Sequence, residues 1–257
     1  MKKYIIDLRV TGTERVGAQC VLLRMEPVEG ALPEMAPGQF VQLRVDAQGV
    51  FLRRPISIHD VRGNEIDFLV QVVGEGTQWL ASLTVGDTVN AVLPLGKGFS
   101  THHPQPTTPL LVGGGVGVAP LLYLGRVLKE KGIRPTFLLG ARTKDLLLRL
   151  DAFREVGEVL VTTEDGSMGE KGFVTQHSVF NSTTPSLIQC CGPTPMMKAV
   201  AKLARERGID CEVSLENRMA CGMGACLCCV TETTEGHKCV CTEGPVFDAS
   251  ELLMAKG

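Results

Sequence analysis

The chain is poor in aromatic residues and carries no strong excess of charge of either sign. Phe, Tyr and Trp make up 5% of its 257 residues, with a single Trp, and the formal net charge is -2 at pH 7. Recognition of nucleic-acid phosphates requires a concentrated excess of Lys and Arg. This sequence has no such excess, so we expect no nucleic-acid partner.

Long apolar runs are also missing. No apolar stretch approaches the roughly 18 residues that a membrane span requires. The apolar run in the amino-terminal MKKYIIDLRV is too short, before Asp7, for a signal peptide. We therefore expect a cytoplasmic protein with no membrane partner. In a reducing compartment, clustered cysteines bind metal or carry out redox chemistry more often than they form structural disulfides.

A chain of this length in which 44% of the residues are hydrophobic can bury one large core or two to three smaller ones. Short strand-like segments dominate its first hundred residues. Gly, Pro and Asp separate the segments, a pattern that favours a small antiparallel barrel. The expected strands are residues 4–10, 20–25, 40–45, 56–59, 66–73 and 88–92.

The pattern changes after a polar, proline-rich segment, THHPQPTTP at 101–109, which is typical of a linker. Apolar strands now alternate with helical stretches such as Pro195 to Arg207. This alternation predicts a parallel sheet in an α/β domain. A cysteine-rich tail follows the last expected strand.

The glycine-rich segment GGGVGVAP, residues 113–120, lies between an expected strand and an expected helix. Glycines there let the backbone approach a pyrophosphate, and the helix N-terminus stabilises negative charge. The strict dinucleotide fingerprint is broken, because Val118 occupies the last small-residue position and no acid follows the next strand at 140–142. A tight turn is the alternative interpretation.

Two further motifs lie in the barrel region. In LRRPISI, residues 52–58, two arginines precede a strand, and a guanidinium can grip a diphosphate with two hydrogen bonds. In VVGEGTQWL, residues 72–80, Thr77 is placed to cap a helix beside Gly76. A solvated strand edge and an ordinary helix cap are the alternatives. The five histidines show no metal spacing, and no arrangement typical of a hydrolase is present.

The cysteines are the strongest signal, since six of the ten lie between Cys221 and Cys241. Cys221, Cys226 and Cys229 are spaced C-x4-C-x2-C, and Cys239 or Cys241 completes the ligand set of a plant-type [2Fe-2S] cluster. Glycines in the first gap let N–H groups turn toward the sulfurs. Zinc is the alternative, with Cys226, Cys229, Cys239 and Cys241 as ligands. It leaves Cys221 unexplained, and its C-x-C half departs from the usual zinc spacing.

Together the motifs are similar to those of the ferredoxin reductase superfamily over essentially the whole chain. They occur in the order GQF, RRPIS, GEGT, GGGVGVAP, EDGSMGEKGFVT, CGP and the cysteine tail. The tail, with CTEGPVF, most resembles the electron-transfer subunits of NAD-dependent, type B dihydroorotate dehydrogenases. The resemblance implies a flavin-binding antiparallel β-barrel at 1–101, a parallel-sheet NAD-binding α/β domain at 102–214 and a small [2Fe-2S] domain at 215–257.

The resemblance also implies three sets of site residues and no catalytic side chain. The FAD site would contain Arg53, Arg54, Pro55, Ile56, Ser57, Val70, Gln71, Val72, Gly76 and Thr77. The NAD site would contain Gly113, Gly114, Gly115, Gly117, Cys191, Gly192 and Pro193. The cluster ligands would be Cys221, Cys226, Cys229 and Cys241, the last chosen over Cys239 because TEGPVF follows it. Carboxylates at Glu164 and Asp165 favour NAD over NADP, because they would repel a 2′-phosphate.

The implied function is electron transfer in pyrimidine (UMP) biosynthesis. A flavin-bearing (β/α)8 barrel needs about 250 residues by itself, so the dihydroorotate site belongs to another polypeptide. Electrons would pass from the FMN of that catalytic subunit through [2Fe-2S] and FAD to NAD+, in a heterotetramer of two plus two. Within the same class, the chain could instead serve a hydrogenase, a sulfite reductase or a ferredoxin:NADP oxidoreductase. A zinc-stabilised, non-enzymatic interaction module is the alternative from another class.

Overall fold

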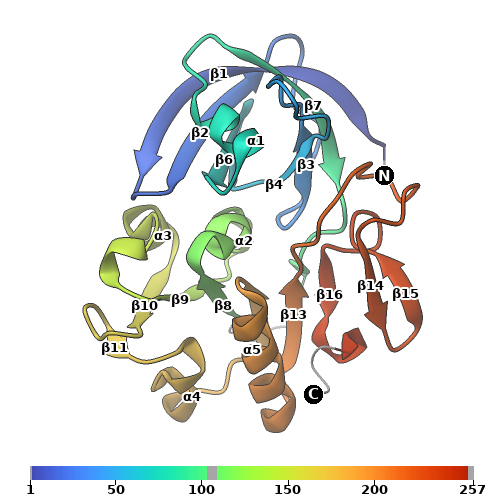
Figure 1. Cartoon of the computed structure of the whole chain (residues 1–257). Helices are drawn as coiled ribbons and strands as arrows, with labels where there is room; N and C mark the ends of the chain where they lie inside the picture. The colour runs from blue at the N-terminus through green and yellow to red at the C-terminus, as the bar shows by residue number, and fades with distance from the viewer. Residues whose placement is uncertain (1, 103–108, 254–257) are drawn as a thin grey trace.

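The computed structural model describes residues 2–102 and 109–253, which form two seven-stranded sheets and a separate two-stranded hairpin (Figure 1). Most of the predicted linker at 101–109 lies outside the described residues. The first sheet occupies one end of the molecule, and the second sheet with its helices occupies the other. Within the described part of the chain, no helix is long and apolar enough to cross a membrane.

The first sheet is antiparallel throughout and has the order β4-β3-β7-β1-β2-β6-β5. Its strands are β1 (Tyr4–Val16), β2 (Cys20–Pro27), β3 (Phe40–Leu43), β4 (Arg54–Ser57), β5 (Asp60–Arg62), β6 (Glu65–Gln71) and β7 (Thr88–Leu95). The helix α1 (Glu75–Ala81) follows β6. The sheet curls around a core that includes the wholly buried side chains of Leu8, Leu23 and Phe68. The predicted antiparallel barrel is therefore confirmed, as a half-barrel with β4 and β5 at its two edges.

The second sheet has the order β11-β10-β9-β8-β12-β13-β16, and all its strands are parallel except the last. Its strands are β8 (Pro109–Gly114), β9 (Thr136–Ala141), β10 (Glu158–Thr163), β11 (Glu170–Lys171), β12 (Leu187–Cys191), β13 (Asp210–Ser214) and β16 (Val246–Asp248). The α-helices are α2 (Ala119–Glu130), α3 (Leu150–Val156), α4 (Val179–Ser182) and α5 (Thr194–Arg207). The 3-10 turns are η1 (Gly115–Val118), η2 (Lys144–Leu146), η3 (Val174–Gln176) and η4 (Ala249–Glu251).

Alternate residues of β8 supply both cores of this α/β unit. Leu111 packs with Leu121 of α2 and Phe153 of α3. The residues on either side of it, Leu110 and Val112, pack with α5. Successive side chains of a strand point to opposite faces of its sheet. The predicted parallel α/β arrangement is confirmed, with α2 and α3 on one face and α5 on the other.

The chain after β13 forms the hairpin of β14 (Val230–Thr233) and β15 (Gly236–Cys239) and then returns to the second sheet. There, Val213 of β13 pairs with Phe247 of β16. Phe247, Cys229 and Cys241 share one buried apolar cluster with Phe40 of the half-barrel. This cluster packs the cysteine-rich segment against both larger units.

Candidate functional site

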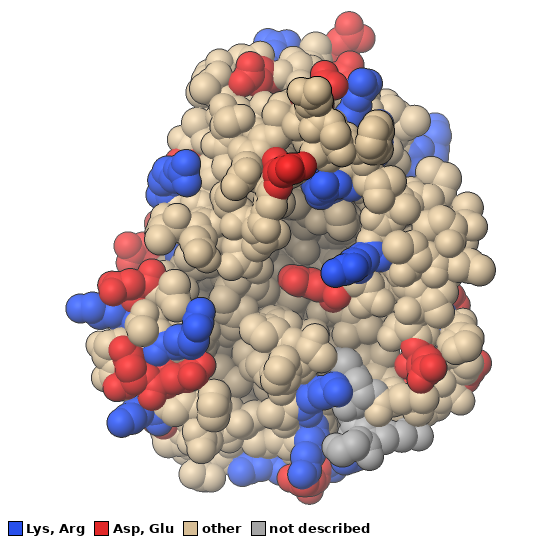
Figure 2. Space-filling model, viewed as in Figure 1, with Lys and Arg blue, Asp and Glu red and all other residues tan. Residues whose placement is uncertain are grey.

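A pocket of about 720 Å³ lies where the half-barrel meets the carboxyl ends of the parallel strands. Figure 2 shows the molecule hollowed in this region, with charges of both signs around the hollow. The strands β9 and β12 lie on opposite sides of β8, so the strand order reverses there. Ligands of open parallel sheets bind at such a reversal, outside the carboxyl ends of the strands.

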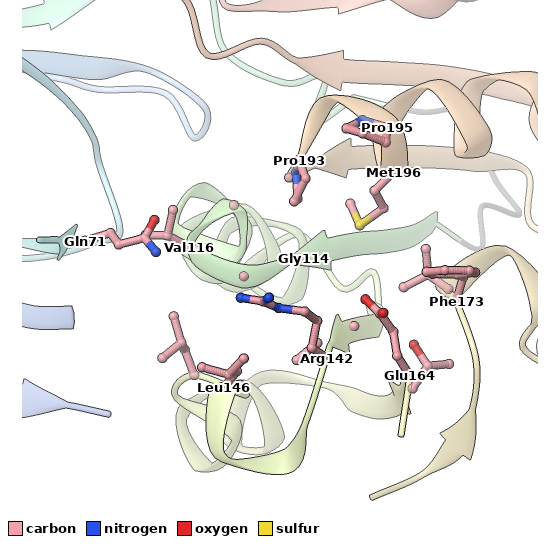
Figure 3. A pocket seen from close by; sticks show the side chains of 18 of the residues that line it. Gln71, Gly114, Val116, Arg142, Leu146, Glu164, Phe173, Pro193, Pro195 and Met196 are labelled. Atoms are coloured by element: carbon pink, nitrogen blue, oxygen red, sulfur yellow. The ribbon is translucent and has the colours of Figure 1, made fainter. Parts of the chain in front are cut away.

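The glycine-rich loop and the Cys191–Pro193 turn form one wall of the pocket (Figure 3). A Cβ atom on Gly117 would lie 2.4 Å from Cα of Gly192, so the two segments approach as closely as glycine allows. Gly115 has φ +57° and open space where a side chain would stand. At these glycines the wall of the pocket is backbone without side chains, which suits a pyrophosphate.

Five of the seven predicted NAD residues line this pocket: Gly114, Gly115, Gly117, Gly192 and Pro193. The other two lie behind the wall. Gly113 faces Leu121, whose Cδ1 would be 2.9 Å from an added Cβ atom, and Cys191 is buried. These two residues shape the wall from behind.

Side chains from the ends of β9 and β10 form the facing wall. Arg142 follows β9 and extends into the pocket, while Glu164 follows β10 (Figure 3). Asp165 is not among the lining residues, because the side chain and the N–H of Ser167 both donate to its carboxylate, at 2.7 and 2.9 Å. These bonds lower the pKa of Asp165. Of the two predicted carboxylates, only Glu164 faces the pocket.

The predicted flavin residues come together where β4, the end of β6 and α1 meet. A Cβ atom on Gly76 would lie 2.4 Å from Nε of Arg54, so the guanidinium lies directly over this glycine. The hydroxyl of Thr77 accepts hydrogen bonds from the N–H groups of Val73 and Gly74, at 2.9 and 3.0 Å. These bonds hold the turn that leads into α1.

Arg53 has a different environment from its neighbour Arg54. Its guanidinium donates to the backbone and side-chain oxygens of Asn90 in β7, at 2.9 and 2.6 Å, and to the carbonyl of Gln42 at 3.3 Å. The side chain therefore fastens the β4 edge to β3 and β7. Of the predicted FAD residues, Gln71 also lines the large pocket, which places the end of β6 beside the glycine-rich wall.

Four of the clustered thiols stand in two pairs. The thiol of Cys226 hydrogen-bonds Cys221, and the thiols of Cys229 and Cys241 are likewise hydrogen-bonded to each other. Within the described residues, no three His, Cys, Asp or Glu side chains converge as ligands of a single ion. Two pairs suit a binuclear cluster instead, because each iron of a four-cysteine [2Fe-2S] centre takes two thiolates.

Backbone N–H groups point at these sulfurs. Met223 donates to Cys221 at 3.4 Å, and Gly224 donates to Cys241 at 3.2 Å. Gly224 has φ +84°, a conformation that glycine adopts without strain. The Met223 bond is the main cause that lowers the pKa of Cys221, whereas burial raises the pKa of Cys241. Soft sulfur ligands with donors aimed at them fit an iron-sulfur cluster.

The two extra cysteines differ in position. The thiol of Cys228 points to the carbonyl of Arg218, at 3.6 Å. Cys239 pairs across the hairpin with Val230, the residue after Cys229, and packs against the buried cluster that contains Cys229 and Cys241. The structure thus separates Cys228 from the four predicted ligands and keeps Cys239 beside them.

Comparisons with known proteins agree with these features. The iron-sulfur cluster binding domain of dihydroorotate dehydrogenase B matches residues 216–253, and the oxidoreductase NAD-binding domain matches residues 111–202. The dihydroorotate dehydrogenase B (NAD(+)) electron transfer subunit of Caldanaerobacter subterraneus subsp. tengcongensis is 39% identical over 256 residues, which is 98% of this chain and 99% of that protein. The chain belongs to this family of electron-transfer subunits. The family member from Fusobacterium nucleatum subsp. nucleatum is 41% identical over 226 residues, covering 84% of this chain and 86% of that protein.

Solved structures extend the comparison of this electron-transfer subunit. The structure of an NADH-dependent reduced ferredoxin-NADP oxidoreductase superposes with a TM-score of 0.85 at 32% identity, covering 97% of this chain and 90% of that one. The FAD/NAD binding domain of a nitric oxide dioxygenase from Vibrio cholerae gives a TM-score of 0.70 at 20% identity, covering 81% of this chain and 98% of that one. The second likeness shows the fold alone, and both agree with the predicted fold class.

Several pocket residues of the electron-transfer subunit were not among the predicted site residues. Arg142 was visible only as a basic residue where the dinucleotide fingerprint has an acid. Phe173 lies in the EDGSMGEKGFVT motif, directly before η3, and Met196 lies in the first turn of α5. Glu216 opens the segment matched by the iron-sulfur domain and also lines the pocket, where burial raises its pKa.

Proposed function

We propose that this chain carries electrons between a catalytic partner subunit and NAD, by way of a [2Fe-2S] cluster and FAD. The observation that carries the proposal is that one pocket brings together residues of the predicted FAD and NAD sites with Glu216, which precedes the first predicted cluster ligand, Cys221. Gln71 comes from the flavin strand, Gly115 from the dinucleotide loop and Glu216 from the start of the iron-sulfur segment. The predicted FAD and NAD sites therefore adjoin, as direct transfer between their two ligands requires.

The chain's own residues would bind and orient these groups. Arg54, lying over Gly76, would pair with the flavin diphosphate, and Arg53 would act indirectly by fixing the strand edge. The bare backbone from Gly114 to Gly117 would hold the NAD pyrophosphate. Cys221, Cys226, Cys229 and Cys241 would hold the iron. When bound, the flavin would exchange electrons singly with the cluster and in pairs with NAD.

The partner that fits is the FMN-containing catalytic subunit of a dihydroorotate dehydrogenase, in a cytoplasmic assembly of two copies of each chain. The relatives' name supports a catalytic partner, because it describes an electron transfer subunit. The three binding roles would be divided among domains with boundaries at about residues 101 and 214. The strand β16 of the cluster segment pairs with β13 of the NAD-side sheet.

A visible spectrum and a co-purification experiment test the proposal. The full-length chain should show flavin absorbance, the absorbance of a [2Fe-2S] centre and anaerobic bleaching of the flavin by NADH. Co-expressed with an FMN-containing dihydroorotate dehydrogenase, it should co-purify and support NAD+ reduction by dihydroorotate. A colourless protein that NADH does not reduce contradicts the proposal.

A related subunit of a ferredoxin:NADP oxidoreductase is the second candidate, because the reduced ferredoxin-NADP oxidoreductase structure covers nearly the whole chain at 32% identity. Both candidates use the same cofactors and differ in their partner. Electron transfer to NAD+ from dihydroorotate in the co-purified complex supports the first, and transfer only from reduced ferredoxin supports the second.

A further inference from the structure

His59 lies between the half-barrel and α2 and is wholly buried. It follows β4, the strand that carries Arg54 and Ser57, after a single intervening residue. Its ring Nδ1 is 2.8 Å from the carbonyl oxygen of Ala119, the first residue of α2. A carbonyl oxygen only accepts, so Nδ1 carries the proton and donates. Burial lowers the pKa of His59 to about 4, so the ring is neutral near pH 7.

The backbone of His59 makes a second bond to the same helix. Its carbonyl oxygen accepts from the N–H of Tyr123 at 3.1 Å. In a regular α-helix, the N–H of Tyr123 and the C=O of Ala119 are partners of each other, because they are four residues apart. The carbonyl of His59 therefore accepts from the N–H of Tyr123, and its ring donates to the C=O of Ala119. The loop before β5 is joined to the first turn of α2 at two points.

That first turn continues directly from the dinucleotide wall. Gly115 and Gly117 lie in η1, which ends one residue before Ala119. On the barrel side, the N–H of His59 donates to the carbonyl of Asp67 in β6 at 2.9 Å, and β6 ends at Gln71 in the pocket. One residue thus connects both walls between which flavin and nicotinamide would meet, through its backbone on the barrel side and through its ring and backbone on the α2 side.

We propose that His59 is a positioning residue that sets the distance between flavin and nicotinamide through its paired bonds to Ala119 and Tyr123. This inference rests on the proposed function. Hydride transfer requires reacting atoms about 3 to 3.5 Å apart, and a displacement of about 1 Å can slow a reaction about 100-fold. Loss of the ring donor would let α2 and its glycine loop shift, and would slow transfer more than it weakens binding of either cofactor.

The test compares three substitutions in the full-length, FAD-loaded chain. His59→Phe keeps an aromatic ring and removes the donor, His59→Asn keeps a donor near the position of Nδ1, and His59→Gln places its amide near the position of Nε2. Anaerobic stopped-flow reduction by NADH gives the limiting rate of flavin bleaching and the Kd for NADH separately.

In His59→Phe we expect the limiting rate to fall about tenfold or more, with FAD content and the NADH Kd close to wild type. His59→Asn should restore most of the rate. If His59→Phe does not fold, the comparison of the two amides decides, and His59→Gln should be clearly slower than His59→Asn. Equal limiting rates in these variants and the wild type overturn the positioning role. A wild-type protein that NADH does not reduce instead overturns the proposed function.

Discussion

The guanidinium of Arg126 in α2 forms two parallel hydrogen bonds with the carboxylate of Asp60 in β5, at 2.9 and 2.8 Å. The side chain of Asp60 is 2% exposed and that of Arg126 is 28% exposed, so the carboxylate is buried between the half-barrel and the α/β unit while the guanidinium is partly open to solvent. Ala119, Tyr123 and Arg126 lie on one face of α2, since they are four and three residues apart. The ion pair therefore extends the contact that His59 begins.

Arg126→Met should destabilise the protein by about 3 kcal/mol, because it leaves the Asp60 carboxylate buried without its main partner. Arg62, whose Nε is 3.5 Å from Asp60, keeps the loss at the lower end of the range for buried pairs. The measurement is the free energy of unfolding in urea. Arg154→Ala, which removes an exposed pair with Asp151, is the control and should change it by less than about 0.5 kcal/mol. Equal losses in both variants would show that the buried Asp60 carboxylate does not depend on Arg126.

Arg54→Ala should weaken FAD binding by about 1.5 to 3 kcal/mol, the usual value of a hydrogen bond to a charged group. Flavin content after gel filtration and the Kd of the apoprotein for FAD measure the effect. Arg44→Ala is the matched control, because Arg44 is an exposed arginine of the same sheet region whose carboxylate partner, Asp46, is itself exposed. Unchanged FAD affinity in Arg54→Ala would show that Arg54 is a solvated strand-edge residue that does not bind the flavin diphosphate.

Glu164 should determine the preference for NADH over NADPH. Glu164→Gln removes the carboxylate that faces the pocket, so kcat/KM for NADPH should rise relative to NADH by about tenfold, equivalent to about 1.4 kcal/mol. Asp165→Asn is the control and should leave the ratio unchanged, because Ser167 holds that side chain outside the pocket lining. Steady-state kinetics with both cofactors give the ratios. A larger shift in Asp165→Asn than in Glu164→Gln would reverse the assignment.

Serine at Cys221, Cys226, Cys229 or Cys241 should abolish or distort the cluster, since a hydroxyl is a poor substitute for a soft thiolate. Each variant should keep NADH oxidation with an artificial two-electron acceptor and lose electron transfer with the catalytic subunit. The electron paramagnetic resonance signal of the reduced cluster is the direct measurement.

Cys228→Ser is the control within the same loop, and its signal should be normal because that thiol points to Arg218. Cys239→Ser tests the competing ligand assignment, since Cys239 packs against the cluster that contains Cys229 and Cys241. A normal signal in Cys241→Ser, together with its loss in Cys239→Ser, would identify Cys239 as the fourth ligand in place of Cys241.

Much of the fold could be predicted because its signals are local. The change from short strands to alternating strands and helices appears in the order of apolar residues, and each expected strand lies near its predicted place. The short strands β5, β11, β14, β15 and β16 were not expected. Some boundaries differ. β1 continues to Val16, beyond the expected end at Val10, because Val16 pairs with Cys20 across the hairpin. A pairing of this kind depends on the neighbouring strand as well as on the segment itself.

The sequence by itself determined which chemical groups are available: the C-x4-C-x2-C spacing with a later cysteine, the glycine-rich loop and the arginine motif. Backbone freedom and ligand spacing are properties of short segments, so they can be seen without a structure. Only the tertiary structure decided which of two adjacent residues, such as Arg53 and Arg54, faces a site and which supports the fold. It turned Arg53 toward Asn90 and Arg54 over Gly76, and it joined His59 to Ala119, 60 residues away. These choices depend on packing between distant elements, where burial forces each polar group to find a partner, and no local pattern records that partner.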